Sequence, residues 1–344
     1  MKFSQVCFHE FGYELPPKVV TSADLELRLA PLYERLKLPS GRLELMSGIK
    51  ERRFWPKGTL PSQGAVLAGR KALAASGIDG CQIEALFFTG VSRDLMEPAT
   101  ASFVHHELGL PPRCLIYDIS NACLGFLDAV LTLGTMIELG QVKNGLIVTC
   151  ETAEELVEST INQLLTNDEL TRKTVKGSFA SLTIGSGAVA LVLGDRRCQD
   201  TGHYLCSAAY RANTAHNDLC RGGKGHGGGT LMATDSEALL IQGVETARAT
   251  WEDFLLESGW EPQSIETFFC HQVGQAHARL LFETLELDPA RNYETLDRLG
   301  NIGSASAPIT MAMGIDNGRL RSGNRASVLG IGSGINCLML GIQW

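Results

Sequence analysis

The chain contains an internal repeat, which constrains the fold more than any other feature of the sequence. Residues Ser76–Asp79 and the apolar run that follows them recur at Ser258–Glu261 and the run after it, at one constant interval. At nearly the same interval, Gly145–Glu151 lines up with Ala326–Gly332. Two matched segments in the same order indicate that one folding unit occurs twice in the chain.

Each copy has the pattern of a helix, a strand, a second strand, a second helix and a third strand. Helices are predicted over Gln63–Ser76 and Glu237–Ser258 at the first position of the two copies. Short apolar runs in the first copy predict strands buried on both faces: Ala85–Thr89, Leu115–Ile119 and Leu146–Cys150. The sequence therefore predicts an α/β fold with a mixed sheet in each half. We place the join near Leu193–Gly202, which divides the chain into residues 1–195 and 196–344.

Composition excludes several classes of function. The formal charge of −8 comes without basic blocks, so nucleic acid is not expected as a partner. No apolar run is long enough to span a membrane, and Met1–Val6 has no secretory signal, so we expect a cytoplasmic protein. The ten cysteines form no C-x-x-C pair and no Cys/His cluster, which predicts reduced thiols and no metal site. The glycine run Gly222–Gly229 lacks P-loop spacing and is interpreted as a surface loop.

The loops that follow the strands of the two halves should meet at one face. In open α/β sheets, ligands bind beyond the carboxyl ends of the strands. Pseudo-symmetric halves would bring equivalent loops together there, and these loops carry most of the reactive side chains. They are Gly90–Glu97, Ser120–Gly125, His271–Ala276, Gly300–Ser304 and Gly330–Gly334.

Cys123 has the position of a nucleophile. It follows an apolar strand and precedes a helix predicted over Leu124–Leu139, with Ser120 or Asn121 as the N-cap. In the first helical turn, unpaired amides and the helix dipole would lower the pKa of the thiol. The alternative for any single cysteine is a small buried side chain, and we adopt it for the other nine.

His271 and Asn301 stand on loops that should face Cys123. His271 ends a buried apolar strand, and Asn301 lies in the loop Gly300–Ser304. Each has a structural alternative, because a single histidine is more often structural than catalytic and Gly-Asn-x-Gly is also an ordinary turn.

Five segments spread along the sequence resemble those of one known family, in the same order. Ser120–Cys123, His271–Gly274 and Gly300–Pro308 resemble the Cys–His–Asn set of the ketoacyl-synthase III branch of the thiolase superfamily, and the resemblance extends to Ser47–Arg53 and Gly330–Gly334. It implies a thiolase-like fold of two pseudo-symmetric halves, layered α-β-α-β-α, in a homodimer.

The resemblance also implies a division of chemical roles. Cys123 would attack an acyl thioester, and His271 and Asn301 would donate hydrogen bonds to the thioester oxygen of a second substrate. The backbone amides of Cys123 and Ser333 would form an oxyanion hole. The remaining expected contacts with substrate involve Gly332 and Gly334, for close approach of the backbone, and Arg52 and Arg53, for an anionic substrate.

Glu97 distinguishes between two reactions. The stretch Val91–Ala101 resembles the OleA-type enzymes, in which the matching glutamate enters the active site of the partner subunit and acts as a base. A malonyl donor forms its carbanion by losing carbon dioxide, whereas an ordinary acyl-CoA needs a base at its α-carbon. The alternative for Glu97 is a solvated loop residue.

Two departures from the fatty-acid-initiating synthases make a carrier-protein donor less favoured. Leu43–Met46 lacks the tryptophan that stacks on the adenine of coenzyme A, and the segment His271–Ala276 lacks the arginine that docks the carrier protein. The sequence thus predicts an acyltransferase that joins two fatty acyl-CoA molecules by a non-decarboxylative Claisen condensation. The product would be a 2-alkyl-3-oxoalkanoate for olefin or related lipid synthesis, made without a cofactor.

Two alternatives remain. One is a decarboxylative 3-oxoacyl-ACP synthase III that uses a malonyl thioester, and the other is a homologue that binds acyl chains without turnover.

Overall fold

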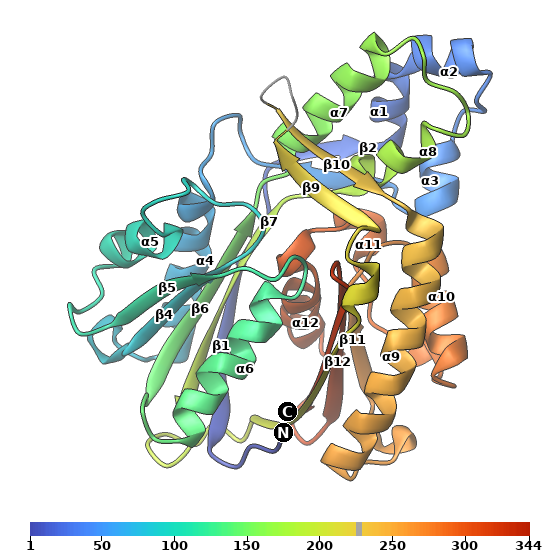
Figure 1. Cartoon of the computed structure of the whole chain (residues 1–344). Coiled ribbons are helices and arrows are strands. Elements are labelled where there is room, and N and C mark those ends of the chain that lie inside the picture. Colours follow the sequence, from blue (N-terminus) through green and yellow to red (C-terminus); the bar gives the residue numbers. More distant parts are fainter. Residues whose placement is uncertain (225–228) are drawn as a thin grey trace.

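The computed structural model describes residues 1–224 and 229–344, and nine strands within these ranges form one hydrogen-bonded sheet (Figure 1). Its order is β11-β12-β13-β8-β1-β7-β6-β4-β5. The strands of the first half are β1 (Val6–Glu14), β4 (Ala85–Thr89), β5 (Leu115–Ile119), β6 (Asn144–Glu151) and β7 (Gly187–Asp195). Those of the second half are β8 (Tyr204–Ala212), β11 (Thr267–Cys270), β12 (Arg325–Gly332) and β13 (Asn336–Gln343).

The nine-stranded sheet divides into two parts, the first sheet in the first half of the molecule and the second sheet in the second half, which are joined along one narrow seam. Strand β1 pairs with β7 along its length but with β8 only at Cys7 and Tyr204. In the first half β4 is parallel to β5 and β6, and in the second half β11 is parallel to β12. The predicted mixed sheet in each half is confirmed.

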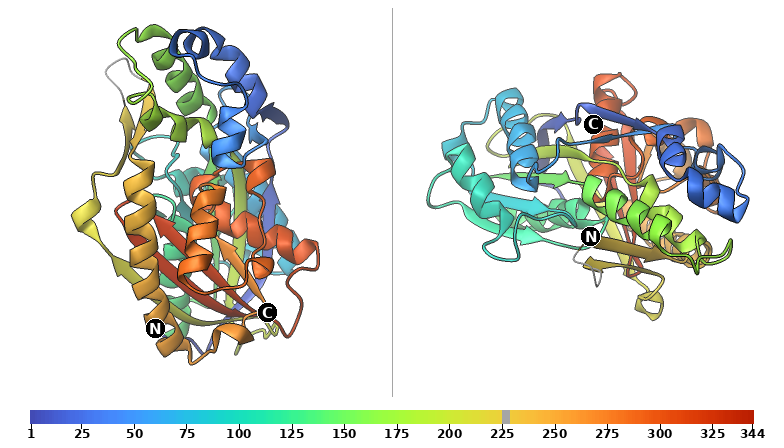
Figure 2. Two further views of the ribbon diagram at one scale, coloured as in Figure 1. Left: turned by 90° about the vertical axis from the view of Figure 1, so that its right-hand side faces the viewer. Right: turned by 90° about the horizontal axis from the view of Figure 1, so that it is seen from above.

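Helices cover both sheets on both sides. On the outer faces lie α4 (Pro61–Ser76) and α5 (Thr100–Leu108) for the first half, and α9 (Ser236–Ser258) and α10 (Gln275–Thr284) for the second. Between the sheets lie α6 (Gly125–Glu138) and α12 (Ser306–Asp316), which contact strands of both halves (Figures 1 and 2). This is the expected α-β-α-β-α arrangement.

The repeat is visible in the details of the chain path. Helices α4 and α9 both end at a glycine in the left-handed region, Gly77 with φ 67° and Gly259 with φ 69°. A short 3₁₀ turn and then a buried strand follow in each copy. Glycine supplies this helix-ending conformation without a steric penalty, which explains the Ser-Gly pair in both copies.

The remaining elements break the symmetry. In the first half they are β2 (Lys18–Thr21), α1 (Ser22–Arg28), α2 (Ala30–Leu36), α3 (Arg42–Ser47), β3 (Glu51–Phe54), α7 (Glu154–Thr166) and α8 (Lys176–Phe179). In the second half they are β9 (Cys220–Lys224), β10 (Thr230–Thr234) and α11 (Leu296–Leu299). Most of these elements gather at one end of the molecule, beyond the sheets (Figure 1).

Two local predictions are corrected. Strand β5 has its predicted limits, but it is the edge strand of the sheet and Leu115 is 45% exposed, so it is not buried on both faces. The glycine run does not begin as a loop, because Cys220–Lys224 is β9 and pairs antiparallel with β10. Residues 225–228 of the predicted loop lie outside the described residues.

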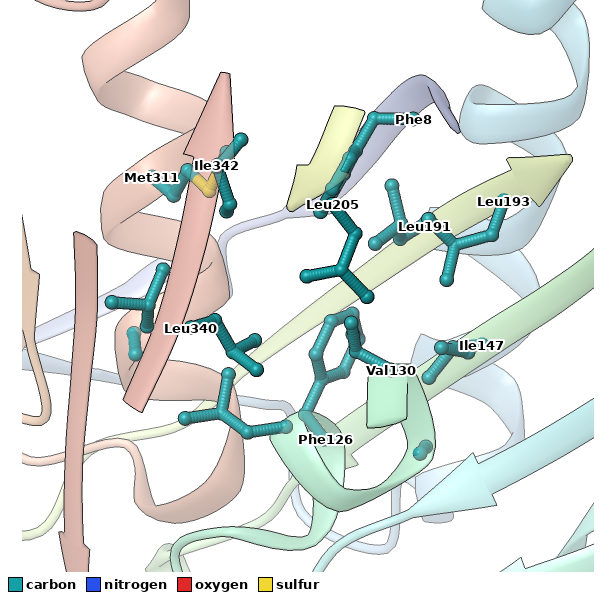
Figure 3. Packing of buried hydrophobic residues seen from close by; sticks show 14 of the residues in the cluster. Phe8, Phe126, Val130, Ile147, Leu191, Leu193, Leu205, Met311, Leu340 and Ile342 are labelled. Atoms are coloured by element: carbon teal, nitrogen blue, oxygen red, sulfur yellow. The ribbon is translucent and has the colours of Figure 1, made fainter. Parts of the chain in front are cut away.

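One hydrophobic core spans both halves. It joins Phe8 and Leu191 of the first sheet to Leu340 of the second through Phe126 of α6 and Met311 of α12 (Figure 3). The predicted boundary after residue 195 falls between β7 and β8. Because the core is continuous across it, the packing does not divide the chain there, and the boundary remains a prediction. Within the described residues, no helix is long and apolar enough to cross a membrane.

The contact between β1 and α4 can be tested at Gly12. A Cβ atom there would lie 2.4 Å from both Ala68 O and Ala72 N on the backbone of α4, which cannot move without displacing the helix. We expect Gly12→Ala to lower the free energy of unfolding by about 1–3 kcal/mol, measured by urea denaturation. The matched control is Gly223→Ala in β9, where an added Cβ atom would meet no atom of the described residues within 4 Å beyond its chain neighbours. There we expect a change under about 0.5 kcal/mol. Equal effects of the two substitutions would contradict this packing.

Candidate active site

Cys123 lies in a tight turn between β5 and α6. The turn is closed by Leu124 N donating to Asn121 O at 2.9 Å, and Ala122 adopts a left-handed φ of 47°. For a residue with a side chain this conformation is unfavourable, and such backbone strain concentrates at functional sites. The helix begins only at Gly125, so the predicted placement of Cys123 in the first helical turn is wrong.

Asn121 does not cap the helix. The N-cap position belongs to Leu124, which makes no side-chain capping bond. The Asn121 side chain instead donates from Nδ2 to Asp128 Oδ2 at 2.8 Å, one helical turn into α6.

Four of the predicted loops meet around Cys123. A Cβ atom on Gly332 would lie 3.6 Å from Cys123 Cβ, so the end of β12 packs directly on the nucleophile. A Cβ atom on Gly125 would lie 3.4 Å from Gly90 N and 3.3 Å from Ser304 Oγ. Phe126 N donates to the same Ser304 hydroxyl at 2.8 Å. The structure therefore brings together the loops after β4, β5 and β12 and the loop that carries Asn301.

Glu151 is a buried carboxylate at this junction that the sequence analysis missed. Its side chain accepts hydrogen bonds from Val91 N and Ser92 N, both at 3.0 Å, and from Ser304 N at 3.2 Å. Burial raises the pKa of Glu151, and these bonds oppose the shift by stabilising the ionised form. The sequence did contain a signal for Glu151, which is an acidic residue at the end of an apolar strand. A carboxylate buried at such a place needs hydrogen-bond donors around it, and loops at the end of a sheet can supply them.

The thiol of Cys123 is harder to ionise than expected. Burial raises its pKa to about 12, and the nearby Glu151 carboxylate adds to the increase. The predicted lowering by the helix dipole is therefore wrong, since desolvation outweighs the partial charge of a helix that begins two residues later. Cys123 needs a base to become a nucleophile at neutral pH. Of the other nine cysteines, Cys81 and Cys198 are exposed, so burial does not hold for all of them.

His271 lies at the carboxyl end of β11, as predicted. It follows β11 directly and is fixed by its backbone N donating to Leu329 O of β12 at 2.9 Å. Burial lowers the pKa of His271 to about 4, with a further contribution from His277, so the ring is neutral at pH 7. Its Nδ1 atom is buried and has no hydrogen-bond partner among the described residues. A neutral imidazole with an unpaired nitrogen can accept or donate one proton.

Asn301 is held in one orientation. The residue is buried, and its side-chain oxygen accepts from Gly303 N at 2.9 Å. Its backbone is fixed as well, because Asn301 N donates to Thr183 O at 3.0 Å and Gly185 N donates to Asn301 O at 2.8 Å. With the oxygen occupied, the amide nitrogen Nδ2 is the group that can donate to a ligand.

The two arginines differ from the expectation. Arg52 is completely buried, and its guanidinium donates to Val20 O at 3.3 Å and Ser22 Oγ at 3.0 Å. Burial also lowers the pKa of Arg52 to about 10. The prediction that Arg52 binds substrate is corrected, because its guanidinium is buried and bonds inside the protein. Arg53 is half-buried and donates to Pro16 O at 3.2 Å, and its predicted role is unchanged.

Glu97 lies apart from these buried groups in the single chain. It is exposed, at the end of a loop on which three apolar side chains are also exposed: Val91, Leu95 and Met96. Met96 is 93% exposed, which is unusual for a side chain of this kind. Among the described residues no group of three or more His, Cys, Asp or Glu side chains could hold a metal ion.

Comparison with known proteins identifies related sequences over the whole chain. The family model for 3-oxoacyl-[acyl-carrier-protein] synthase III matches residues 117–214, and the model for the C-terminal part of that family matches residues 255–344. The chain is 44% identical to the acyl-CoA:acyl-CoA alkyltransferase of Shewanella oneidensis and 34% identical to that of Xanthomonas campestris, over 100% of each chain. A beta-ketoacyl-[acyl-carrier-protein] synthase III of Roseiflexus castenholzii is 27% identical, over 97% of this chain and 96% of that one.

Solved structures agree with this relationship. A glutamate-to-glutamine variant of Xanthomonas campestris OleA superposes with a TM-score of 0.95 at 34% identity, covering 100% of this chain and 98% of that one. The same values hold for the cerulenin-bound form of that protein.

Other OleA structures carry substitutions of a cysteine and a histidine. The replaced glutamate precedes the replaced cysteine by the same number of residues that separates Glu97 from Cys123. The chain therefore belongs to the OleA-type branch of the 3-oxoacyl-ACP synthase III family, within the thiolase superfamily.

Proposed function

We propose that this acyltransferase joins two fatty acyl-CoA molecules head to head by a non-decarboxylative Claisen condensation. The observation that carries the proposal is the position of Glu97, which matches the interval between glutamate and cysteine in Xanthomonas campestris OleA. The curated relatives with 44% and 34% identity are named acyl-CoA:acyl-CoA alkyltransferases, whereas the Roseiflexus synthase is 27% identical.

The first step would load an acyl group on Cys123. The sulfur attacks the thioester carbon while the thiol proton passes to the unpaired nitrogen of His271. The backbone amides of Cys123 and Ser333 hold the oxyanion that forms. The bond to the sulfur of coenzyme A then breaks, the departing thiolate takes the proton, and Cys123 keeps the acyl group as a thioester.

The second step would form the carbon–carbon bond. Glu97 removes a proton from the α-carbon of the second acyl-CoA, and negative charge develops on its thioester oxygen. His271 and Asn301 Nδ2 donate hydrogen bonds to that oxygen. The α-carbon attacks the acyl carbon on Cys123, and the carbon–sulfur bond breaks. The proton that Glu97 removed then returns to the cysteine thiolate by way of solvent, so that both groups regain their starting states.

Water then cleaves the remaining thioester of the condensed product. This hydrolysis releases the second coenzyme A and a 2-alkyl-3-oxoalkanoate, and no cofactor takes part in any of these steps. We infer a role in long-chain olefin or related lipid synthesis, where such a product would be consumed.

Glu97 would act in the active site of a second copy of the chain. Among the described residues, strand β5 pairs with a neighbouring strand on one side only, and Leu115 on it and Phe103 on α5 are partly exposed. The exposed side chains of Leu95 and Met96 lie on the loop that carries Glu97. We infer a homodimer that covers these surfaces, with Glu97 of each chain entering the other's site.

The choice of donor can be tested with a long-chain acyl-CoA as the sole substrate. We expect release of free coenzyme A and formation of the condensed acid, measured by thiol titration and mass spectrometry. Glu97→Gln should lower condensation by about 10²–10⁴-fold while the acyl adduct on Cys123 still forms, because only the α-proton step needs this base.

The control for Glu97→Gln is Glu107→Gln, which removes an exposed glutamate on α5 and should leave the rate unchanged. Product formation that requires a malonyl thioester and ignores Glu97→Gln would favour the decarboxylative alternative. A wild-type chain that forms no acyl adduct would favour a binding-only protein.

The raised pKa of the Cys123 thiol predicts how its reactivity depends on pH. In His271→Ala, which lacks the neighbouring base, alkylation of Cys123 by iodoacetamide should accelerate about tenfold per pH unit from pH 7 to pH 10. The reason is that a thiol with a pKa of about 12 becomes thiolate only as the pH rises. Peptide mass spectrometry separates Cys123 from the other cysteines, with Cys123→Ser as the control. A plateau near pH 8 would show instead that the thiol ionises easily.

A further inference from the structure

A chain of side-chain hydrogen bonds links the nucleophile turn to the loop after β12. Asn121 Nδ2 donates to Asp128 Oδ2 at 2.8 Å, and Asn121 Oδ1 accepts from Asn336 Nδ2 at 3.0 Å. The same Asn336 nitrogen donates to Ser333 O at 3.2 Å. The chain thus runs from α6 through the turn to β13, and it crosses from the first half of the molecule to the second.

We propose that Asp128, Asn121 and Asn336 are positioning residues that set the geometry of the oxyanion hole. The inference deepens the proposed function and depends on it, because it assigns a role to the groups that hold the amides of Cys123 and Ser333. None of the three side chains needs to touch substrate to act in this way.

The contacts explain why this series of hydrogen bonds would control the positions of both backbone amides. Asn121 stands two residues before Cys123, and its backbone oxygen closes the turn by accepting from Leu124 N. Ser333 stands three residues before Asn336, whose side chain holds its carbonyl. The two loops are therefore tied to each other by one amide side chain, at the place where Gly332 packs on Cys123.

Asp128 determines which group donates and which accepts in each hydrogen bond of the series. An ionised carboxylate only accepts hydrogen bonds, so the Asn121 amide must present its nitrogen to Asp128 and its oxygen to Asn336. Asn336 must then donate. Burial raises the pKa of Asp128, and the bond from Asn121 opposes that shift. A reversed amide at position 121 would place two nitrogen donors against each other.

The surrounding backbone leaves little room for another arrangement. Gly334 has a φ of 134°, and a Cβ atom there would lie 2.4 Å from Asn336 Nδ2. Any side chain at Gly334 would therefore displace the Asn336 amide from its two acceptors. Oxyanion-hole donors work only when they point at the developing charge, so a small displacement reduces their effect on the rate.

The test measures acylation of Cys123 by a p-nitrophenyl ester of a fatty acid. This reaction needs the thiol and the oxyanion hole but neither Glu97 nor bound coenzyme A. The rate of acylation can therefore be measured even if the proposed condensation of two acyl-CoA molecules is wrong. Asn336→Asp replaces the donor by an acceptor that faces Asn121 Oδ1 and Ser333 O. We expect acylation to slow about 10- to 100-fold, less than the roughly 10²–10³-fold cost of losing an oxyanion-hole donor outright because the amides are displaced but still present, with KM changed less than about threefold.

A charge-swapped pair separates positioning from folding. Asn121→Asp alone places two carboxylates together and should slow acylation about as much as Asn336→Asp. The double variant Asn121→Asp/Asp128→Asn restores complementary partners, because position 121 then accepts from both neighbours. We expect the double variant to recover to within about threefold of the wild-type acylation rate.

The control for general effects on β13 is Gln343→Ala. Gln343 Nε2 donates to Gly323 O at 2.9 Å at the other end of this strand, so its loss should change stability without slowing acylation. The proposal is overturned if the folded single variants acylate within about twofold of wild type, or if the double variant is no faster than Asn121→Asp. A wild-type chain that the ester does not acylate would also overturn it, since no oxyanion hole would then be operating.

Discussion

The burial of α6 between the two sheets is the constraint on which the rest of the structure depends. This helix contacts strands of both halves, and its apolar side chains, such as Phe126 and Val130, belong to the core that joins them. Its first turn is fixed by the bond from Phe126 N to Ser304 Oγ. Because Cys123 lies two residues before the helix, any packing that fixes α6 also fixes the thiol. The loops of the second half then reach the nucleophile because their strands pack on the opposite side of the same helix.

The electrostatic character of the site follows from the loss of water around its reactive groups. Burial keeps the Cys123 thiol protonated and the His271 ring neutral, and both effects come mainly from the loss of water. The thiol and the imidazole are therefore both uncharged before substrate binds. Charge would develop only during reaction, next to amide groups that are already oriented, as at Asn301. Preoriented dipoles in a dry site stabilise such charge more strongly than mobile water does.

The sequence predicts the architecture well because the repeat reports on local geometry. Matching glycines at Gly77 and Gly259 end equivalent helices, and the limits predicted for β4 and β5 agree with the structure. The position of β5 at the edge of the sheet could not be read in this way. An apolar run shows that a strand packs somewhere, but it does not show how many neighbours the strand has.

The errors at the site have a common physical origin, which is desolvation by distant parts of the chain. A helix-end position indicates a reactive thiol only if water remains, and the surroundings of Cys123 come from loops far away in sequence. The prediction for Arg52 failed for the same reason. Its side chain is buried under Gly185 and Gly300, and this tertiary packing cannot be read from the local sequence. Glu151 and the bond between Asn121 and Asn336 were missed because the partners are remote in sequence. Pattern analysis locates reactive residue types, whereas their ionisation depends on the folded surroundings.

The bare backbone around the thiol also limits how this enzyme can diversify. A Cβ atom at Gly125 would lie 3.3 Å from Ser304 Oγ, and one at Gly332 would lie 3.1 Å from Leu124 Cγ, so a side chain at either position would require its neighbours to shift. A change in the size or shape of the acyl group accepted must therefore come from more distant walls of the site. Directed evolution of substrate range should leave the glycines beside Cys123 unchanged and vary residues that line the path of the acyl chain.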